Sequence, residues 1–183
     1  MSQLNRLQRN AIVLSLAGEL RAAESWCGET HLQKAVYLLQ ELTEVPLGFD
    51  FILYKHGPFS FDLRDALIAM RADYQLRHLI HPIPYGPSLV ATDTGKKLQE
   101  RFSSVIGKYR KQVTFVAKQL GSKSVTELER IGTALYVQRE NEPMTVDQNA
   151  RRVNELKPHV SLDLAKAAAE QVDEMVAAHG SSD

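Results

Sequence analysis

One cysteine and several histidines are the residues of this chain that could bind a metal. Cys27 and His31 lie four residues apart, and His56, His78 and His81 follow in other parts of the sequence. Zinc sites usually combine closely spaced pairs of ligands, often two such pairs. Only one cysteine is present, and the histidines fall on separate expected elements. We therefore expect no metal and no other cofactor, and we interpret these histidines as surface or core residues.

A serine close to a histidine, Ser60 after His56, could supply a nucleophile and its base. Ser60 is better explained as the N-cap of a helix, where its hydroxyl accepts a hydrogen bond from the first turn. Asp62 and Asp65 fall on the polar face of that helix, where solvated carboxylates are ordinary. The chain also lacks a G-x-S-x-G elbow, a phosphate-binding glycine loop and an H-E-x-x-H pair. We expect no catalytic residue, and so a protein that is not an enzyme.

Turn and cap chemistry explains the stretch FILYKHGPFSFDLRDALIAM, residues 51–70. Residues 51–54 are aromatic and β-branched, which favours a short strand. Gly57 permits a sharp turn, and Pro58 keeps Gly57 out of helical geometry. A helix then begins after Ser60, with an apolar stripe along one side. The corner between the strand and the helix is thus explained without a functional role.

The remaining elements are predicted from apolar spacing and turn residues. Helices are expected over residues 3–24 and from a cap at Thr30, and residues 76–91 predict a hairpin. After Thr92, apolar residues from Leu98 to Leu120 recur every three or four positions, which predicts one long helix. Residues 124–183 predict three more helices. The expected fold is mainly α with a small β-hairpin wing: a winged-helix-like domain over residues 1–95, then a helical domain over residues 96–183.

The charges of the chain are unevenly distributed, although its formal net charge is zero. Residues 94–123 contain eight basic side chains and one glutamate, a net charge of +7, whereas residues 1–93 carry −2 and residues 124–183 carry −5. A basic segment between acidic ends can meet nucleic acid, an acidic partner or the acidic part of its own chain. On the long helix, five basic residues are predicted to line one flank of the apolar seam: Lys97, Arg101, Lys108, Lys111 and Lys118.

Five segments of the chain carry a resemblance to a known family. They are LQKAVYLL (32–39), FILYKHGPFSFDL (51–63), VATDTG (90–95), ELERIGTALYV (127–137) and VNELKPHVSLDLAKAA (153–168). Together they resemble a prokaryotic family of winged-helix-like proteins typified by YwgA, and more distantly the Panacea antitoxin domain. His56 stands where the family usually has a tyrosine before Gly-Pro. The resemblance implies a winged-helix-like fold and a regulatory or neutralising role, and it implies no catalytic residues.

Two functions stay open, DNA binding and protein binding. DNA binding is favoured by the order of elements, which is that of a winged helix, and by the basic segment. It is also favoured by Arg64 and Arg71 on the helix before the hairpin. Asp62 and Asp65 on that same helix would repel phosphate. The hairpin is apolar and has Arg77 as its fixed charge, whereas wings that contact DNA bring Arg or Lys to the backbone. We therefore expect a protein partner or a homodimer, with DNA binding as the alternative. The expected partner-binding residues are Leu79, Ile80, Ile83 and Tyr85, and the alternative nucleic-acid-binding residues are Arg64, Arg71, Lys97, Arg101, Lys108, Lys111 and Lys118.

The compartment is predicted from three features of the sequence. No run of about 18 apolar residues occurs, so no membrane span is expected. The first residues lack the apolar block of a secretory signal. A single cysteine cannot form an internal disulfide, which fits a reducing cytoplasm. We expect a cytoplasmic protein without membrane contact, and no small-molecule substrate is evident from the sequence.

Overall fold

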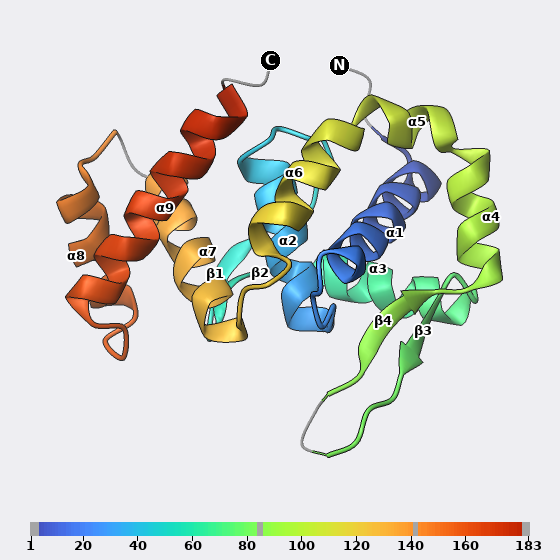
Figure 1. The fold of residues 1–183 in the computed structure, drawn as a ribbon, viewed down its shortest axis with the longest axis horizontal. Coiled ribbons are helices and arrows are strands. Elements are labelled where there is room, and N and C mark those ends of the chain that lie inside the picture. The colour runs from blue at the N-terminus through green and yellow to red at the C-terminus, as the bar shows by residue number, and fades with distance from the viewer. Residues whose placement is uncertain (1–3, 84–85, 141–142, 181–183) are drawn as a thin grey trace.

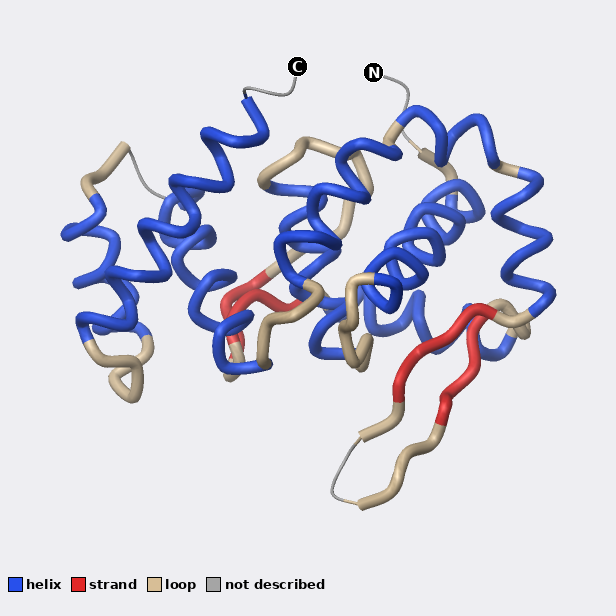
Figure 2. Tube along the Cα trace, in the orientation of Figure 1, coloured by secondary structure: helices blue, strands red, loops and turns tan. Residues whose placement is uncertain are grey.

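The computed structural model describes residues 4–83, 86–140 and 143–180. In these ranges the protein is mainly helical, with two small antiparallel sheets of two strands each (Figures 1 and 2). The predicted class, mainly α with a small β-hairpin, is confirmed. The helices are α1 (Arg6–Ala22), α2 (Glu29–Glu41), α3 (Phe61–Ala72), α4 (Asp93–Arg101), α5 (Ser103–Lys108), α6 (Arg110–Leu120), α7 (Val125–Glu140), α8 (Val146–Leu156) and α9 (Leu162–Gly180). The strands are β1 (Ile52–Tyr54), β2 (Gly57–Phe59), β3 (Leu76–Leu79) and β4 (Ser88–Ala91).

Helix α2 is enclosed by other elements on several sides. It packs against α1, α6, α7 and β2, and its residues 31–39 are all buried. This run includes Gln33 and Lys34, so polar side chains of α2 meet protein instead of water. The helix begins directly after Gly28, which has the extended backbone of an N-cap. The predicted cap at Thr30 is therefore wrong.

The corner at residues 51–60 is a β-hairpin followed by a helix. Strand β1 pairs with β2, and Tyr54 lies opposite Gly57. Gly57 has φ +82°, a conformation that residues with a side chain rarely adopt. Ser60 caps α3 as predicted, because its hydroxyl accepts a hydrogen bond from the first turn at 3.1 Å. The sequence predicts a turn at Gly57 and Pro58, whereas these residues begin strand β2. Proline is tolerated there because the sheet has only two strands, and both are edge strands.

The β3–β4 hairpin extends from one end of the helical body (Figure 1). It confirms the hairpin predicted over residues 76–91. At the base of the hairpin, Leu76 lies opposite Ala91. Residues 26–27 run beside β4, where the amide of Leu89 donates a hydrogen bond to the carbonyl oxygen of Cys27 at 2.8 Å. The segment between α1 and α2 therefore anchors the hairpin to the body.

The single long helix predicted after the hairpin is wrong, since the chain forms three successive helices, α4, α5 and α6. Phe102 (φ −108°, ψ 26°) and Tyr109 (φ −109°, ψ 12°) separate them. All three pack against α1. A straight helix over residues 93–120 would be roughly 42 Å long, against roughly 25 Å for α1. The two bends therefore keep the apolar side chains in contact with α1.

The last three helices, confirmed as predicted, pack on one another beside α2 (Figure 1). Helix α7 contacts α2 and β2, and α8 and α9 contact α7. One cluster of buried apolar residues runs from Ile12 in α1 to Met175 in α9. That the chain divides at residue 95 into two domains that fold separately stays a prediction. No helix in the described ranges is long and apolar enough to cross a membrane.

Candidate functional site

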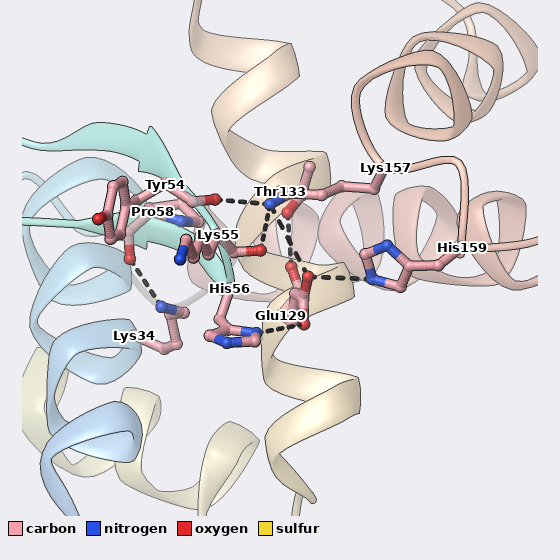
Figure 3. Close-up of polar contacts among 9 residues, drawn as sticks. All are labelled: Lys34, Tyr54, Lys55, His56, Pro58, Glu129, Thr133, Lys157 and His159. Carbon is pink, nitrogen blue, oxygen red and sulfur yellow. Dashed lines mark hydrogen bonds and ion pairs between the residues drawn. The ribbon is translucent and has the colours of Figure 1, made fainter.

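A cluster of charged side chains lies where α2, the β1–β2 hairpin, α7 and the segment after α8 meet (Figure 3). Helix α2 supplies Lys34, the hairpin turn supplies His56, and α7 supplies Glu129. Lys157 and His159 come from the segment between α8 and α9. We call these five residues the corner cluster. Of the five, His56 alone was considered from the sequence, first as a metal ligand and then as a base.

Lys34 is buried within the corner cluster. The residue is 2% exposed, and its Nζ donates a hydrogen bond to the carbonyl oxygen of Pro58 at 2.8 Å. Burial disfavours the charged amine and lowers the pKa of Lys34 from 10.5 to about 8, while Glu129 raises this pKa and Lys157 lowers it. At neutral pH Lys34 is therefore mostly a buried ammonium ion.

Glu129 joins the elements around the cluster. Its side chain is 8% exposed, and its Oε1 lies 3.8 Å from Nζ of Lys157 and 3.2 Å from Nε2 of His159. Its Oε2 lies 3.5 Å from Nδ1 of His56. Lys157 also donates hydrogen bonds to the carbonyl oxygens of residues 54 and 55, at 2.5 Å each. Glu129 and its partners thus tie the β1–β2 hairpin and the α8–α9 segment to α7.

A pocket of about 240 Å³ opens beside Lys34. Tyr54 and Phe59 of the hairpin line it, with ring centroids 5.8 Å apart, and the first turn of α2 lines it from another side. His56 and Gly57 contribute the hairpin turn. The arrangement places a buried amine, whose pKa burial lowers to about 8, next to a small cavity with aromatic walls. Such a site can bind an anion.

The expected partner-binding residues lie on the β3–β4 hairpin and the loop beyond it. Ile80 is 75% exposed and Ile83 is 96% exposed, whereas Leu79 is half-buried. Tyr85 lies outside the described residues. Large apolar side chains therefore face solvent at this end of the molecule.

A second, larger pocket lies between this hairpin and the first turn of α2. It has a volume of about 590 Å³, and its apolar walls include Trp26, Leu89 and Val125. The indole of Trp26 donates a hydrogen bond to the carbonyl oxygen of Gly86 at 3.0 Å, which links the segment between α1 and α2 to the loop of the hairpin. We call the hairpin residues Leu79, Ile80 and Ile83 together with this pocket the hairpin surface.

The five basic residues that were predicted to lie on one helix lie on three different helices. Lys97 and Arg101 lie on α4, Lys108 ends α5, and Lys111 and Lys118 lie on α6. Because the chain bends between these helices, the five residues do not form the predicted continuous row beside the apolar seam. All five are exposed, and none forms an ion pair within 4.0 Å with another described residue.

The two arginines of α3 differ in their surroundings. Arg64 lies 3.2 Å from the carboxylate of Asp65, and its guanidinium lies over the ring of Phe61, 5.0 Å from the centroid. Arg71 is exposed near the end of the helix. An acidic neighbour therefore offsets the charge of Arg64, which weakens the case for phosphate contact by α3.

The possible metal ligands have separate environments. Nε2 of His31 lies 3.1 Å from the carbonyl oxygen of Lys123, and Nε2 of His81 lies 2.8 Å from the hydroxyl of Ser88. Cys27 is buried, and burial raises the pKa of its thiol to about 11. Within the described part of the chain, no group of three or more His, Cys, Asp or Glu is placed to hold a metal ion.

Sequence reasoning missed four members of the corner cluster. Glu129 and Lys157 stand among other charged residues of predicted helices, and charged side chains are almost always exposed. One signal was available, because Lys34 stands in LQKAVYLL beside Gln33 in an otherwise mostly apolar segment. Such a segment predicts a buried helix whose polar residues need partners.

No protein-family model matches the chain, and no curated protein matches it significantly. The resemblance to YwgA-like and Panacea proteins therefore stays a prediction.

Proposed function

We propose that this chain is a non-catalytic binding module that acts through contact with a protein partner. The observation that carries the proposal is the exposure of Ile80 and Ile83 on the hairpin surface, at 75% and 96%. Exposed apolar side chains next to a pocket are typical of sites for protein contact. The pocket of about 590 Å³ beneath the hairpin offers space for an anchoring side chain of the partner.

The finer fold that we propose is a winged helix with one inserted hairpin. Helices α1, α2 and α3 and strands β3 and β4 follow one another in the order of that fold. The hydrogen bond between Leu89 and Cys27 supports a short third strand beside β4. The β1–β2 hairpin is then an insertion between α2 and α3. The fold by itself hosts many functions, so the hairpin surface carries the functional argument.

The role that we propose is regulatory, of the antitoxin, adaptor or defence-associated type, in the cytoplasm of a prokaryote. This role rests on the resemblance of five segments to YwgA-like and Panacea proteins. The buried thiol of Cys27, with its raised pKa, is unreactive and suits a reducing compartment. The partner is either a different protein or a second copy of this chain.

DNA binding is the second candidate function, because one observation favours it. Five exposed basic residues on α4, α5 and α6 lack acidic partners among the described residues, in a segment of net charge +7. Phosphate groups would supply the missing negative charge. The acids of α3 and the apolar hairpin oppose this candidate.

The first experiment tests the protein partner by changing the hairpin surface. Ile80→Asp combined with Ile83→Asp places two charges on the apolar tip. The matched control is Val176→Asp, which changes a 43% exposed valine on α9. We expect the double variant to lose the protein that co-purifies from the native host, or to lose a dimer mass in light scattering, while the control keeps it. A double variant that keeps both its mass and its partner contradicts the proposal.

The second arm of the experiment measures DNA binding by titration with a duplex at low and at physiological salt. For a DNA-binding protein, the slope of log affinity against log salt is about −0.9 for each phosphate contact. We expect weak binding with no specific complex. Tight, salt-sensitive binding by a monomer, lost when Lys108 and Lys111 are both changed to Glu, would establish the DNA function instead.

A further inference from the structure

The corner cluster contains more buried positive charge than buried negative charge. Lys34 is 2% exposed, Lys157 is 7% exposed and Glu129 is 6% exposed, so two buried ammonium groups face one buried carboxylate. Glu129 is already paired with Lys157 and with two histidines. Lys34 has no carboxylate within 4.0 Å among the described residues. A buried charge without a counter-ion is costly, so this site lacks one negative charge.

The amine of Lys34 also has hydrogen-bonding capacity to spare. An ammonium group has three N–H donors. In the described part of the protein one acceptor is present, the carbonyl oxygen of Pro58 at 2.8 Å. The first turn of α2, which lines the same pocket, follows Gly28 and has no side-chain cap, so its N–H groups add positive potential, which the exposed carboxylate of Glu29 in that turn partly offsets. Both features favour an oxygen anion in the pocket.

The walls of the pocket define the rest of the ligand. A volume of about 240 Å³ is smaller than the roughly 300–1,000 Å³ of typical sites for drug-sized ligands, so one small molecule or one terminal residue fits. The rings of Tyr54 and Phe59 offer faces and edges to a flat apolar group. Tyr54 is 46% exposed, which places the entrance of the pocket at the surface.

We propose that the pocket beside Lys34 binds a small carboxylate with a flat apolar body. The carboxylate accepts hydrogen bonds from Nζ of Lys34, and the flat group lies against Tyr54 and Phe59. Glu129 is already paired with Lys157 and lies more than 4.0 Å from Nζ of Lys34, so it does not occupy the pocket. A free aromatic acid and the C-terminal residue of a peptide present this same chemistry. This pocket is distinct from the hairpin surface, so the proposal of carboxylate binding is tested independently of the proposal of a protein partner.

Pairs of charged and neutral probes test the proposal on the purified full chain. Benzoate is compared with benzamide, which has the same shape without the charge, and Ala-Ala-Phe with a free C-terminus is compared with its amide. Calorimetry and thermal melting are the measurements. We expect each acid to bind at least tenfold more tightly than its amide. Tighter binding of the peptide acid identifies a chain end as the natural ligand, and tighter binding of benzoate identifies a free acid. Acids that bind no better than amides overturn the proposal.

A variant pair locates the site. Lys34→Met removes the charge and keeps the unbranched side chain, so it should abolish the preference for the acids. Lys55→Met, which changes an exposed lysine of the hairpin turn, should preserve that preference. A Lys34→Met variant that folds and still prefers benzoate contradicts the site.

The pH dependence of the unaltered protein provides a test that does not require the variant to fold. With a Lys34 pKa of about 8, the protonated fraction falls about tenfold between pH 7 and pH 9, and the affinity for benzoate should fall with it. Glu29 and His56 also line this pocket, and Glu129 and Lys157 act on Lys34 through their charges. The benzamide series over the same range corrects for changes in these groups. A benzoate affinity that stays constant over this range overturns the proposal.

Discussion

Glu129 is a buried carboxylate that is paired with Lys157, His56 and His159, which come from distant parts of the chain. Changing Glu129→Gln removes the charge, and the ammonium of Lys157 then stays buried with only carbonyl oxygens as partners. Removing one partner of a buried ion pair costs about 3–5 kcal/mol, because the other charge is left uncompensated. We expect a loss of about 3 kcal/mol in the free energy of unfolding, measured by urea denaturation.

The control for this prediction is an exposed pair. Glu155 lies 2.9 Å from Arg152, and both side chains are at least half exposed. Exposed pairs contribute about 0–1 kcal/mol, so Glu155→Gln should leave the urea midpoint nearly unchanged. Equal effects of the two substitutions would show that Glu129 does not hold the cluster together.

For single residues, the sequence predicts the roles that depend on neighbours along the chain. It does not predict the roles that depend on contacts between segments far apart in the sequence. The Ser60 cap depends on a residue three positions away, so its pattern is visible in the sequence. Glu129 meets His56, Lys157 and His159, at sequence separations that no local pattern encodes. Burial of Lys34 likewise depends on which elements enclose α2.

The β1–β2 hairpin depends on one glycine for its turn. Gly57 has φ +82°, and a Cβ there would lie 3.1 Å from the carbonyl oxygen of Glu129. Gly57→Ala therefore combines an unfavourable backbone conformation with a close contact, and we expect a loss of about 1–3 kcal/mol in the free energy of unfolding. Chemical denaturation measures this loss.

Gly107 provides the matched substitution, because it lies in α5 with nothing within 4 Å of an added Cβ. Alanine is favoured over glycine in a helix by about 0.5–1 kcal/mol, so Gly107→Ala should stabilise the protein. If Gly57→Ala stabilises as much as Gly107→Ala, the strained turn is not required.

The elements that were predicted correctly have local signals in the sequence. The errors arise where packing between elements determines where a helix begins, bends or ends. Helix α1, the β3–β4 hairpin and the three C-terminal helices follow from apolar spacing, caps and turn residues. In the apolar seam after Thr92, the residues from Tyr109 to Leu120 are buried, whereas Leu98, Phe102 and Val105 are half-buried. The seam contains no information on the length of α1. The bends at Phe102 and Tyr109 result from that mismatch in length.

One continuous core connects the parts of the molecule that were predicted as two domains. Helices α4, α5 and α6 pack against α1, and α7 packs against α2 and β2. Elements from before and after residue 95 therefore complete each other's buried surfaces. A chain of this size with one shared core is expected to unfold in a single cooperative transition.

Substitution in α9 tests this cooperativity at a distance from the hairpin. Met175 is 2% exposed, and Met175→Ala should cost about 2–5 kcal/mol through lost contacts and a cavity. The single tryptophan, Trp26, lies beside the β3–β4 hairpin and reports on that end by fluorescence, whereas circular dichroism reports on all the helices. We expect both signals to shift to the same lower urea midpoint, because loss of α9 packing destabilises the whole core. A fluorescence transition that keeps the midpoint of the unaltered protein, while the dichroism moves, would establish two independent folding units.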